Sequence, residues 1–479
     1  MRACRQSSLR DSTLIPIPQK GGYQAKRLPG LTQGSCLIQR GICIDLYHRE
    51  SAAPPRRLRG CLLFWRELYW FDIMQTALAD FIRNTADGQR ADTILRKCVH
   101  CGFCTATCPT YQLLGDELDG PRGRIYQIKQ VLEGAHPTPT LRLHLDRCLT
   151  CRACETTCPS GVDYHHLLDI GREQVERLQP RPRLQRLQRK AMVWAFASPA
   201  RLRPLLGLAR TVRSLLPATL RNKIAPRPRR VSQPRQATHR RMLVLDGCVQ
   251  PAIAPNINQS AARVLAHFGI DLQTVNPGAC CGALPHHLSE TEKARAMARA
   301  NIDAWLPHLQ ADAEAIVITA SGCGAQVQDY PYLLADDPTY RDKAQQVADK
   351  ARDLVEVVQA EDLSQLPLQA SAQRTAVHTP CTLQHALQLN GVVDALLKTL
   401  GYQLSEVADN HLCCGSAGTY SLTQAEISSQ LRTRKLEALA VNAPERIVTA
   451  NIGCLGQLQD DEGLPVMHWI DLLEQDLMA

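Results

Sequence analysis

The spacing of apolar residues changes character several times along the chain. Between residues 74 and 98, MQTALADFIRNTADGQRADTILRKC repeats apolar positions at the intervals typical of helices. The segment RGRIYQIKQVLEG has the same spacing and carries a glycine where a helix would end. Residues 80–175 are therefore predicted to form a small, mostly helical module.

From residue 242 onward, short apolar runs alternate with helical patterns. The runs MLVLDGC, AIVITAS, TAVHTPC and RIVTAN have the composition of buried strands, whereas ETEKARAMARANIDAWLPHL and EISSQLRTRKLEALA are typical of helices. This alternation predicts α/β units with a largely parallel sheet. Folds of this kind bind ligands at the carboxyl ends of their strands, where the cysteines of this segment lie.

The same pattern occurs twice after residue 242, with a period of about 133 residues. We expect a first cysteine-rich copy at 242–370 and a second at 371–479, each with a CCG triplet. Their cysteines are Cys248, Cys280, Cys281 and Cys323 in the first copy, and Cys381, Cys413, Cys414 and Cys454 in the second.

Two segments lack such order. Residues 1–73 show no sustained periodicity, and we expect a non-native extension that precedes a true start at Met74; a disordered basic arm is the alternative. Residues 176–241 are rich in Pro and Arg and predict a linker with one or two covering helices. A contact surface for an acidic partner or for anionic lipid headgroups is the other interpretation of this linker.

Length and composition indicate a globular protein with several cores, since 44% of the 479 residues are hydrophobic and 21% are charged. No apolar run approaches the roughly 18 residues of a membrane-spanning helix. The first thirty residues also lack the pattern of a secretion signal. A cytoplasmic location is expected, with peripheral attachment to the inner membrane as a further option.

The net charge of +9 is distributed unevenly. Residues 177–241 contain eighteen Lys or Arg and no Asp or Glu, so the remainder of the chain is acidic. Trp194 and Phe196 form the one aromatic pair of this basic segment, which gives little support for base stacking. We therefore expect no nucleic acid partner.

Cysteine usage narrows the chemistry further. The chain has twenty cysteines, and in a reducing compartment clustered thiolates favour metal ligands over disulfides. KCVHCGFCTATCP recurs fifty residues later as RCLTCRACETTCP. The cysteines of these repeats are Cys98, Cys101, Cys104 and Cys108, followed by Pro109, and Cys148, Cys151, Cys154 and Cys158, followed by Pro159.

The spacing C-x2-C-x2-C-x3-C-P is that of bacterial ferredoxins, in which the fourth cysteine ligates the other of two [4Fe-4S] clusters. Carried over to this chain, the ligands of cluster 1 are Cys98, Cys101, Cys104 and Cys158, and those of cluster 2 are Cys108, Cys148, Cys151 and Cys154. Zinc is the main alternative because C-x2-C pairs also form tetrahedral zinc sites, but zinc does not explain a third cysteine step and a whole duplicate.

Further expectations concern the residues next to the cysteines, the cysteine-rich copies and nucleotide binding. The cationic Arg96, Lys97, Arg147 and Arg152 are expected to raise the reduction potentials of the clusters. The cysteine-rich copies suit a third metal site or a redox-active thiol pair, or they simply pack their thiols. No G-x-G-x-x-G or P-loop is present, so we expect no nucleotide site, no flavin site and no catalytic residue in this chain.

The predicted fold class is an α+β multidomain protein, a helical two-[4Fe-4S] ferredoxin module followed by a duplicated α/β cysteine-rich (CCG) domain. Four segments carry a family resemblance: CVHCGFCTATCPTYQLLGDELDGPRGRIYQIKQVLEG, HLDRCLTCRACETTCPSGVDYHHLLDIGRE, HLCCGSAGTY and IVTANIGC. From about Met74 to the C-terminus the chain resembles the iron-sulfur subunits of bacterial glycolate oxidase, also called glycolate dehydrogenase.

The resemblance implies an electron-transfer subunit of an oxidoreductase complex. An FAD-containing subunit would oxidise glycolate to glyoxylate, a second FAD-binding-like subunit would accompany it, and this chain would pass electrons towards a quinone or membrane acceptor. The alternatives are the iron-sulfur subunit of a related D-lactate or anaerobic glycerol-3-phosphate dehydrogenase, and an iron-sulfur sensor that binds nucleic acid. Gln326 and Gln457 stand where related cysteine-rich domains end in C-x2-C, which argues against a heterodisulfide-reductase-like cluster.

Overall fold

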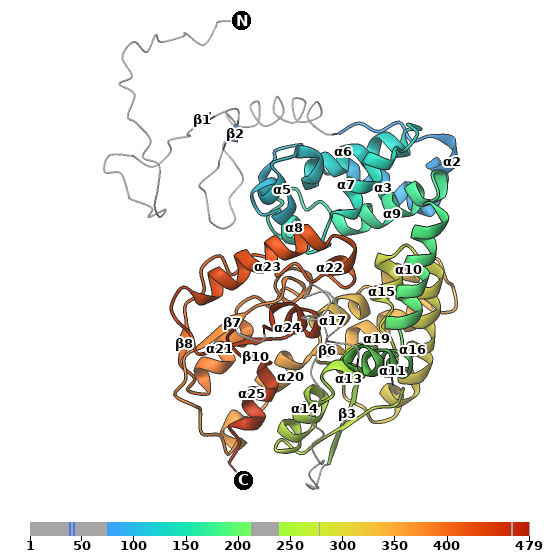
Figure 1. Cartoon of the computed structure of the whole chain (residues 1–479). Helices are drawn as coiled ribbons and strands as arrows, with labels where there is room; N and C mark the ends of the chain where they lie inside the picture. Colours follow the sequence, from blue (N-terminus) through green and yellow to red (C-terminus); the bar gives the residue numbers. More distant parts are fainter. Residues whose placement is uncertain are drawn as a thin grey trace, which may run out of the picture. The chain divides into compact units, whose positions relative to one another are not determined.

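Helices predominate in the computed structural model, which describes residues 38–39, 42–43, 74–211, 239–276, 278–460 and 463–478. The chain divides into two units, Met1–Leu68 and Tyr69–Ala479. In the first unit, β1 (Ile38–Gln39) and β2 (Ile42–Cys43) pair as antiparallel strands. The rest of the predicted extension 1–73 lies outside the described residues. All other described helices and strands belong to the second unit (Figure 1).

The predicted ferredoxin module is helical throughout. Its helices are α2 (Asp80–Arg83), α3 (Ala86–Arg96), α4 (Phe103–Ala106), α5 (Pro109–Leu114), η2 (Glu117–Asp119), α6 (Pro121–Leu132), α7 (Pro139–Asp146), α8 (Ala153–Thr156) and α9 (Tyr164–Leu178). The apolar faces of α3, α6 and α9 meet in one buried core. Helices α6 and α9 approach closely because Gly171 has no side chain; a Cβ there would lie 2.6 Å from Ile128 Cγ1.

The start of this module differs from the sequence prediction. Residues 74–79 are not helical, although their apolar spacing suggested a helix. Met74 and Leu78 instead lie in the buried core of the module. The short helix α2 begins at Asp80 without a side-chain cap, whereas α3 is capped by the Thr85 hydroxyl, which accepts a hydrogen bond from the Gly88 amide.

Two helices, α10 (Arg183–Phe196) and α11 (Pro199–Thr211), follow the module within the basic segment. Val193 and Ala197 of this segment pack against Cys248 and Cys280 of the first cysteine-rich copy. Residues 212–238 lie outside the described part of the chain. None of the described helices is long and apolar enough to span a bilayer.

Each cysteine-rich copy contains a four-stranded parallel sheet. The strands are β3 (Arg240–Val244), β4 (Ile270–Gln273), β5 (Ile316–Ile318) and β6 (Ala351–Asp353) in the first copy, and β7 (Thr375–His378), β8 (Leu404–Ser405), β9 (Arg446–Thr449) and β10 (Val466–His468) in the second. The strand order is β4-β3-β5-β6 in one sheet and β8-β7-β9-β10 in the other. The two copies therefore share one topology, which confirms the predicted duplicated α/β fold.

Helices connect the strands within each copy. Those of the first copy are α13 (Gln250–Ile253), α14 (Asn256–Ala266), α15 (Ala283–His287), α16 (Thr291–Ala311), α17 (Ser321–Gln328), α18 (Tyr330–Leu333), α19 (Arg341–Lys350), α20 (Leu354–Ala360) and η4 (Leu363–Gln365). Those of the second are η5 (Thr382–Ala386), α21 (Val392–Thr399), α22 (Tyr420–Thr423), α23 (Ala425–Ala440), α24 (Ile452–Leu458) and α25 (Trp469–Gln475).

The two copies share a hydrophobic core. Helix α14 of the first copy packs against α25 of the second, and buried residues of both helices belong to one apolar cluster. Polar contacts reinforce this packing: the Ser260 hydroxyl donates to Asp471 at 2.7 Å, and Arg263 pairs with Glu474 at 2.8 Å. Each copy thus covers an apolar helix face that the other would expose.

Candidate iron-sulfur centres

The first cysteine loop follows directly from the end of α3. His100 and Gly102 have positive φ angles of 54° and 83°, which turn the backbone tightly between Cys98 and the short helix α4. The second loop has the same conformation, with φ angles of 53° at Thr150 and 62° at Arg152. Both repeats therefore present their cysteines from the same kind of turn, as their matching sequence spacing predicts.

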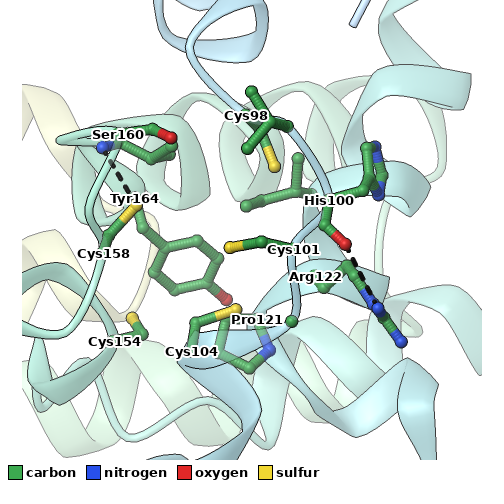
Figure 2. Close-up of a pocket in the computed structure, with 14 residues that line it drawn as sticks. Cys98, His100, Cys101, Cys104, Pro121, Arg122, Cys154, Cys158, Ser160 and Tyr164 are labelled. Carbon is green, nitrogen blue, oxygen red and sulfur yellow. Dashed lines mark hydrogen bonds between the residues drawn. The ribbon is translucent and has the colours of Figure 1, made fainter. Parts of the chain in front are cut away.

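One pocket gathers cysteines from both repeats. Cys98, Cys101 and Cys104 of the first repeat line it together with Cys154 and Cys158 of the second, and Figure 2 shows these thiols around the same space. Most of the remaining lining is apolar and includes Val99, Pro121, Ile125, Val162 and Tyr164. Arg122 closes one side, where its guanidinium donates a hydrogen bond of 3.3 Å to the His100 carbonyl oxygen.

Cys154 also belongs to a second set of thiols, with Cys108, Cys148 and Cys151. Cys151 and Cys154 are buried, and the thiols of Cys108 and Cys148 lie close enough to act on both of them electrostatically. The Tyr164 hydroxyl donates to Cys148 Sγ at 3.7 Å. Two sets of thiols therefore lie side by side, and Cys154 borders both.

Both sets suit metal ions better than free thiols. Burial is the main reason that the pKa of Cys104 rises to about 11, and the neighbouring Cys98, Cys101 and Cys158 add to the rise. Burial also raises the pKa of Cys151 and Cys154 well above the usual thiol value. Thiolates at these positions need a positive partner, and iron bound by four thiolates provides it.

A buried polar network supports the second set. Asp119 is fully buried and accepts hydrogen bonds from Arg147 at 2.7 Å and from Arg124 at 3.4 Å. The Thr110 hydroxyl donates to the Asp119 carbonyl oxygen at 2.8 Å and lies 3.2 Å from Cys108 Sγ. This network fixes the chain around Cys108, which is the cysteine that reaches the other repeat's set.

The second cysteine-rich copy places its thiols against this second set. Cys381, Cys413, Cys414 and Cys454 form a chain in which each thiol contacts the next. Cys381 lies within electrostatic reach of Cys151, and both belong to one hydrophobic cluster. His378 is buried with its ring nitrogens near Cys414 and Cys454. The thiols of the second copy are therefore the protein groups next to the Cys151 loop.

The first cysteine-rich copy has an equivalent thiol chain in a different setting. Cys248, Cys280, Cys281 and Cys323 again contact one another in sequence. This set packs against helix α10 and not against the ferredoxin cysteines. In both copies the amide of the CCG glycine donates to the first cysteine of the triplet at 3.4 Å, as Gly282 does to Cys280 and Gly415 to Cys413.

A cluster of histidines and carboxylates lies beside these centres. The rings of His165 and His166 of α9 are tilted by 37° with a centroid distance of 3.7 Å, and Asp163 pairs with both. Asp329 of the first cysteine-rich copy lies 2.7 Å from His166 Nε2. These residues line a polar pocket and connect the ferredoxin module to that copy.

Comparison with known proteins agrees with this architecture. Residues 94–162 match the family model of a 4Fe-4S dicluster domain, and residues 242–328 and 375–459 match that of a cysteine-rich domain. The chain is 52% identical over 405 residues to the glycolate oxidase iron-sulfur subunit of Escherichia coli (strain K12), which covers 84% of this chain and 99% of that protein. The chain belongs to the glycolate oxidase iron-sulfur subunit family.

More distant relatives share parts of this likeness. A probable glycolate oxidase iron-sulfur subunit of Bacillus subtilis (strain 168) is 31% identical over 430 residues, covering 82% of this chain and 96% of that protein. Lactate utilization protein A of Bacillus subtilis (strain 168) is 28% identical over 239 residues, covering 47% of this chain and 95% of that protein. The likeness to the glycolate oxidase iron-sulfur subunits thus extends over far more of the chain.

These matches confirm the predicted family, the fold class and the two [4Fe-4S] clusters of this glycolate oxidase iron-sulfur subunit family member. The assignment of individual ligands to each cluster stays a prediction. Sequence reasoning missed Asp119, Arg124 and Tyr164 as neighbours of the cysteines. The motif GDELDGPRGR, which contains the first two, is visible in the sequence, but only the fold shows that it surrounds Cys108.

Proposed function

We propose that this chain is the electron-transfer subunit of a glycolate-oxidising enzyme complex. It would accept electrons from an FAD-containing subunit that oxidises glycolate to glyoxylate, accompanied by a second FAD-binding-like subunit. It would pass them towards a quinone-type acceptor at the inner membrane, to which the complex attaches peripherally from the cytoplasm. The observation that carries this proposal is the pair of thiol sets that lie side by side in a module of a 4Fe-4S dicluster family.

Within this role, we assign cluster 1 to Cys98, Cys101, Cys104 and Cys158, and cluster 2 to Cys108, Cys148, Cys151 and Cys154. The bound clusters supply one-electron transfer. The protein would hold the two clusters close together, because in this assignment each cluster has three ligands from one repeat and one from the other. The burial of Cys98, Cys108, Cys151 and Cys154 limits the access of water to these thiolates, whereas Cys101 is exposed.

The proposed function is tested by deleting the gene in its natural host. The deletion strain should fail to grow on glycolate as the sole carbon source, and it should still grow on D-lactate and on glycerol 3-phosphate. A plasmid copy should restore growth, whereas a copy with Cys101→Ser should not. Unimpaired growth of the deletion strain on glycolate would contradict the proposal.

One relative supports an alternative substrate. Lactate utilization protein A matches 47% of this chain, which supports lactate as a substrate, and the iron-sulfur subunit of a D-lactate-oxidising complex is the second candidate. The deletion strain separates the two candidates, because loss of growth on D-lactate with normal growth on glycolate would favour this alternative.

Iron analysis of anaerobically purified protein should give about eight irons per chain if only the two cubane clusters are present.

A further inference from the structure

The two ferredoxin repeats provide an internal comparison, because they correspond position by position with a shift of fifty residues. Val99 corresponds to Leu149, Cys101 to Cys151, and Phe103 to Ala153. The loops also share their backbone conformation, with φ angles of 54° at His100 and 53° at Thr150. The loops therefore have the same local shape, and differences in their surroundings come from the rest of the molecule.

The loop of the second repeat is covered by protein. Leu149 and Ala153 are only 6% and 2% exposed. They pack in one hydrophobic cluster with residues of the second cysteine-rich copy, namely Cys413, Tyr420, Ile427 and Leu431. The Tyr420 hydroxyl also donates to the Arg147 carbonyl oxygen at 3.0 Å. This loop thus serves as a docking site for a protein surface that carries redox-capable thiols.

The loop of the first repeat has the same apolar character but no such cover within the described chain. Val99 is 39% exposed and Phe103 is 54% exposed, and Cys101 is exposed between them. Tyr126 of α6 extends this surface and is 49% exposed. Its ring lies edge-on to that of His100, with 6.4 Å between the ring centroids. Apolar side chains exposed together around a buried cofactor site are typical of protein interfaces.

We propose that the surface formed by Val99, Cys101, Phe103 and Tyr126, the cluster 1 face, is the docking site for the FAD-containing subunit. The proposal rests on the proposed function, which requires a flavin protein as electron donor. Electrons would then enter at the first thiol set, because the second set is enclosed by this chain's own cysteine-rich copy. The covered loop of the second repeat shows that such a turn accepts a protein surface.

The test uses the full-length protein, purified anaerobically with its clusters, and the tagged FAD-containing subunit. The double variant Phe103→Glu/Tyr126→Glu should raise the dissociation constant at least about tenfold, because charges replace apolar contacts at the centre of the interface. Val441→Glu is the matched control, since Val441 is 62% exposed in the second cysteine-rich copy, and it should bind like wild type. Wild-type affinity of the double variant would overturn the proposal.

A second measurement covers the case in which the double variant loses its clusters. A photoreactive phenylalanine analogue placed at position 103 should crosslink to the FAD-containing subunit, whereas the same analogue at position 441 should not. Crosslinks from position 103 to another copy of this chain, or only to the second FAD-binding-like subunit, would overturn the proposal. Normal growth of the deletion strain on glycolate would contradict the proposed function. Failure of the proposed function is therefore distinguishable from failure of the docking proposal.

Discussion

At the scale of single residues, three cationic neighbours of the cysteines have carboxylate partners. Arg147 donates to the buried Asp119 at 2.7 Å, Arg152 pairs with Glu155 at 2.9 Å, and Arg96 pairs with Asp92 at 2.7 Å. The sequence suggested that these arginines raise the reduction potentials of the clusters. Glu155 and Asp92 reduce that effect for Arg152 and Arg96, whereas Asp119 is shared by Arg147 and Arg124 and offsets only one of these two positive charges.

The crossed ligand assignment predicts paired effects of single substitutions. Cys158→Ser should disturb the same cluster as Cys101→Ser, and Cys108→Ser the same cluster as Cys151→Ser, because each set contains one cysteine of the other repeat. EPR spectra of the reduced variants check this, with Cys101→Ser and Cys151→Ser as reference spectra for the two clusters. A Cys158→Ser spectrum that matches Cys151→Ser would refute the crossing.

At the scale of elements, the CCG turns need glycine for two reasons. Gly415 has a φ angle of 83°, and a Cβ there would lie 2.6 Å from the Ser428 carbonyl oxygen. Ser428 belongs to α23, and its hydroxyl donates to the Gly415 carbonyl oxygen at 2.8 Å. The turn that presents Cys413 and Cys414 is therefore held directly against a helix, where a side chain does not fit.

Replacing Gly415 should lower the free energy of unfolding by more than its backbone conformation alone explains. We expect Gly415→Ala to lower the free energy of unfolding by about 2 kcal/mol or more, because the left-handed backbone and the close contact both oppose a Cβ. Gly418→Ala is the control: its φ angle is 63° and a Cβ there would meet no atom within 4 Å, so about 1 kcal/mol is expected. Urea unfolding measures both; equal losses would show that the contact is unimportant.

At the scale of the whole molecule, the ferredoxin module contacts both cysteine-rich copies. Asp329 lies next to both His165 and His166, and the second copy covers the loop of Cys151. Burial by itself lowers the pKa of His165, but the neighbouring carboxylates of Asp163, Asp329 and Glu155 outweigh it and raise the pKa to about 11. Charged imidazole therefore helps to hold the module to the first copy.

This contact should make stability depend on pH. Because the pKa of His165 is higher in the folded state than its usual 6.5, its contribution is complete below about pH 6.5 and is lost as pH rises towards 11. The loss should be up to about 1.4 kcal/mol per pH unit. Thermal unfolding between pH 6 and 9 checks this, and His165→Gln should flatten the dependence. An unchanged pH dependence of stability in His165→Gln would contradict this role of His165.

Much of the architecture could be predicted from local patterns. The runs AIVITAS and RIVTAN became β5 and β9, and the predicted helix in RGRIYQIKQVLEG became α6. The strands β4, β6, β8 and β10 were not predicted, because their sequences IDLQ, ARD, LS and VMH lack the continuous apolar run of AIVITAS. The boundaries expected at 175, 241 and 370 stay predictions, and the shared core of α14 and α25 shows that the two copies are joined.

The sequence by itself determined the chemistry of this protein, because ligand spacing and apolar periodicity are local properties that the chain carries without folding. It determined two cysteine repeats, two CCG copies and their α/β alternation. The tertiary structure alone decided which repeat is covered. Val99 and Leu149 are equivalent apolar residues in sequence, yet one is exposed and the other buried. Burial depends on segments hundreds of residues away, such as Tyr420 against the Cys151 loop, and no local pattern encodes it.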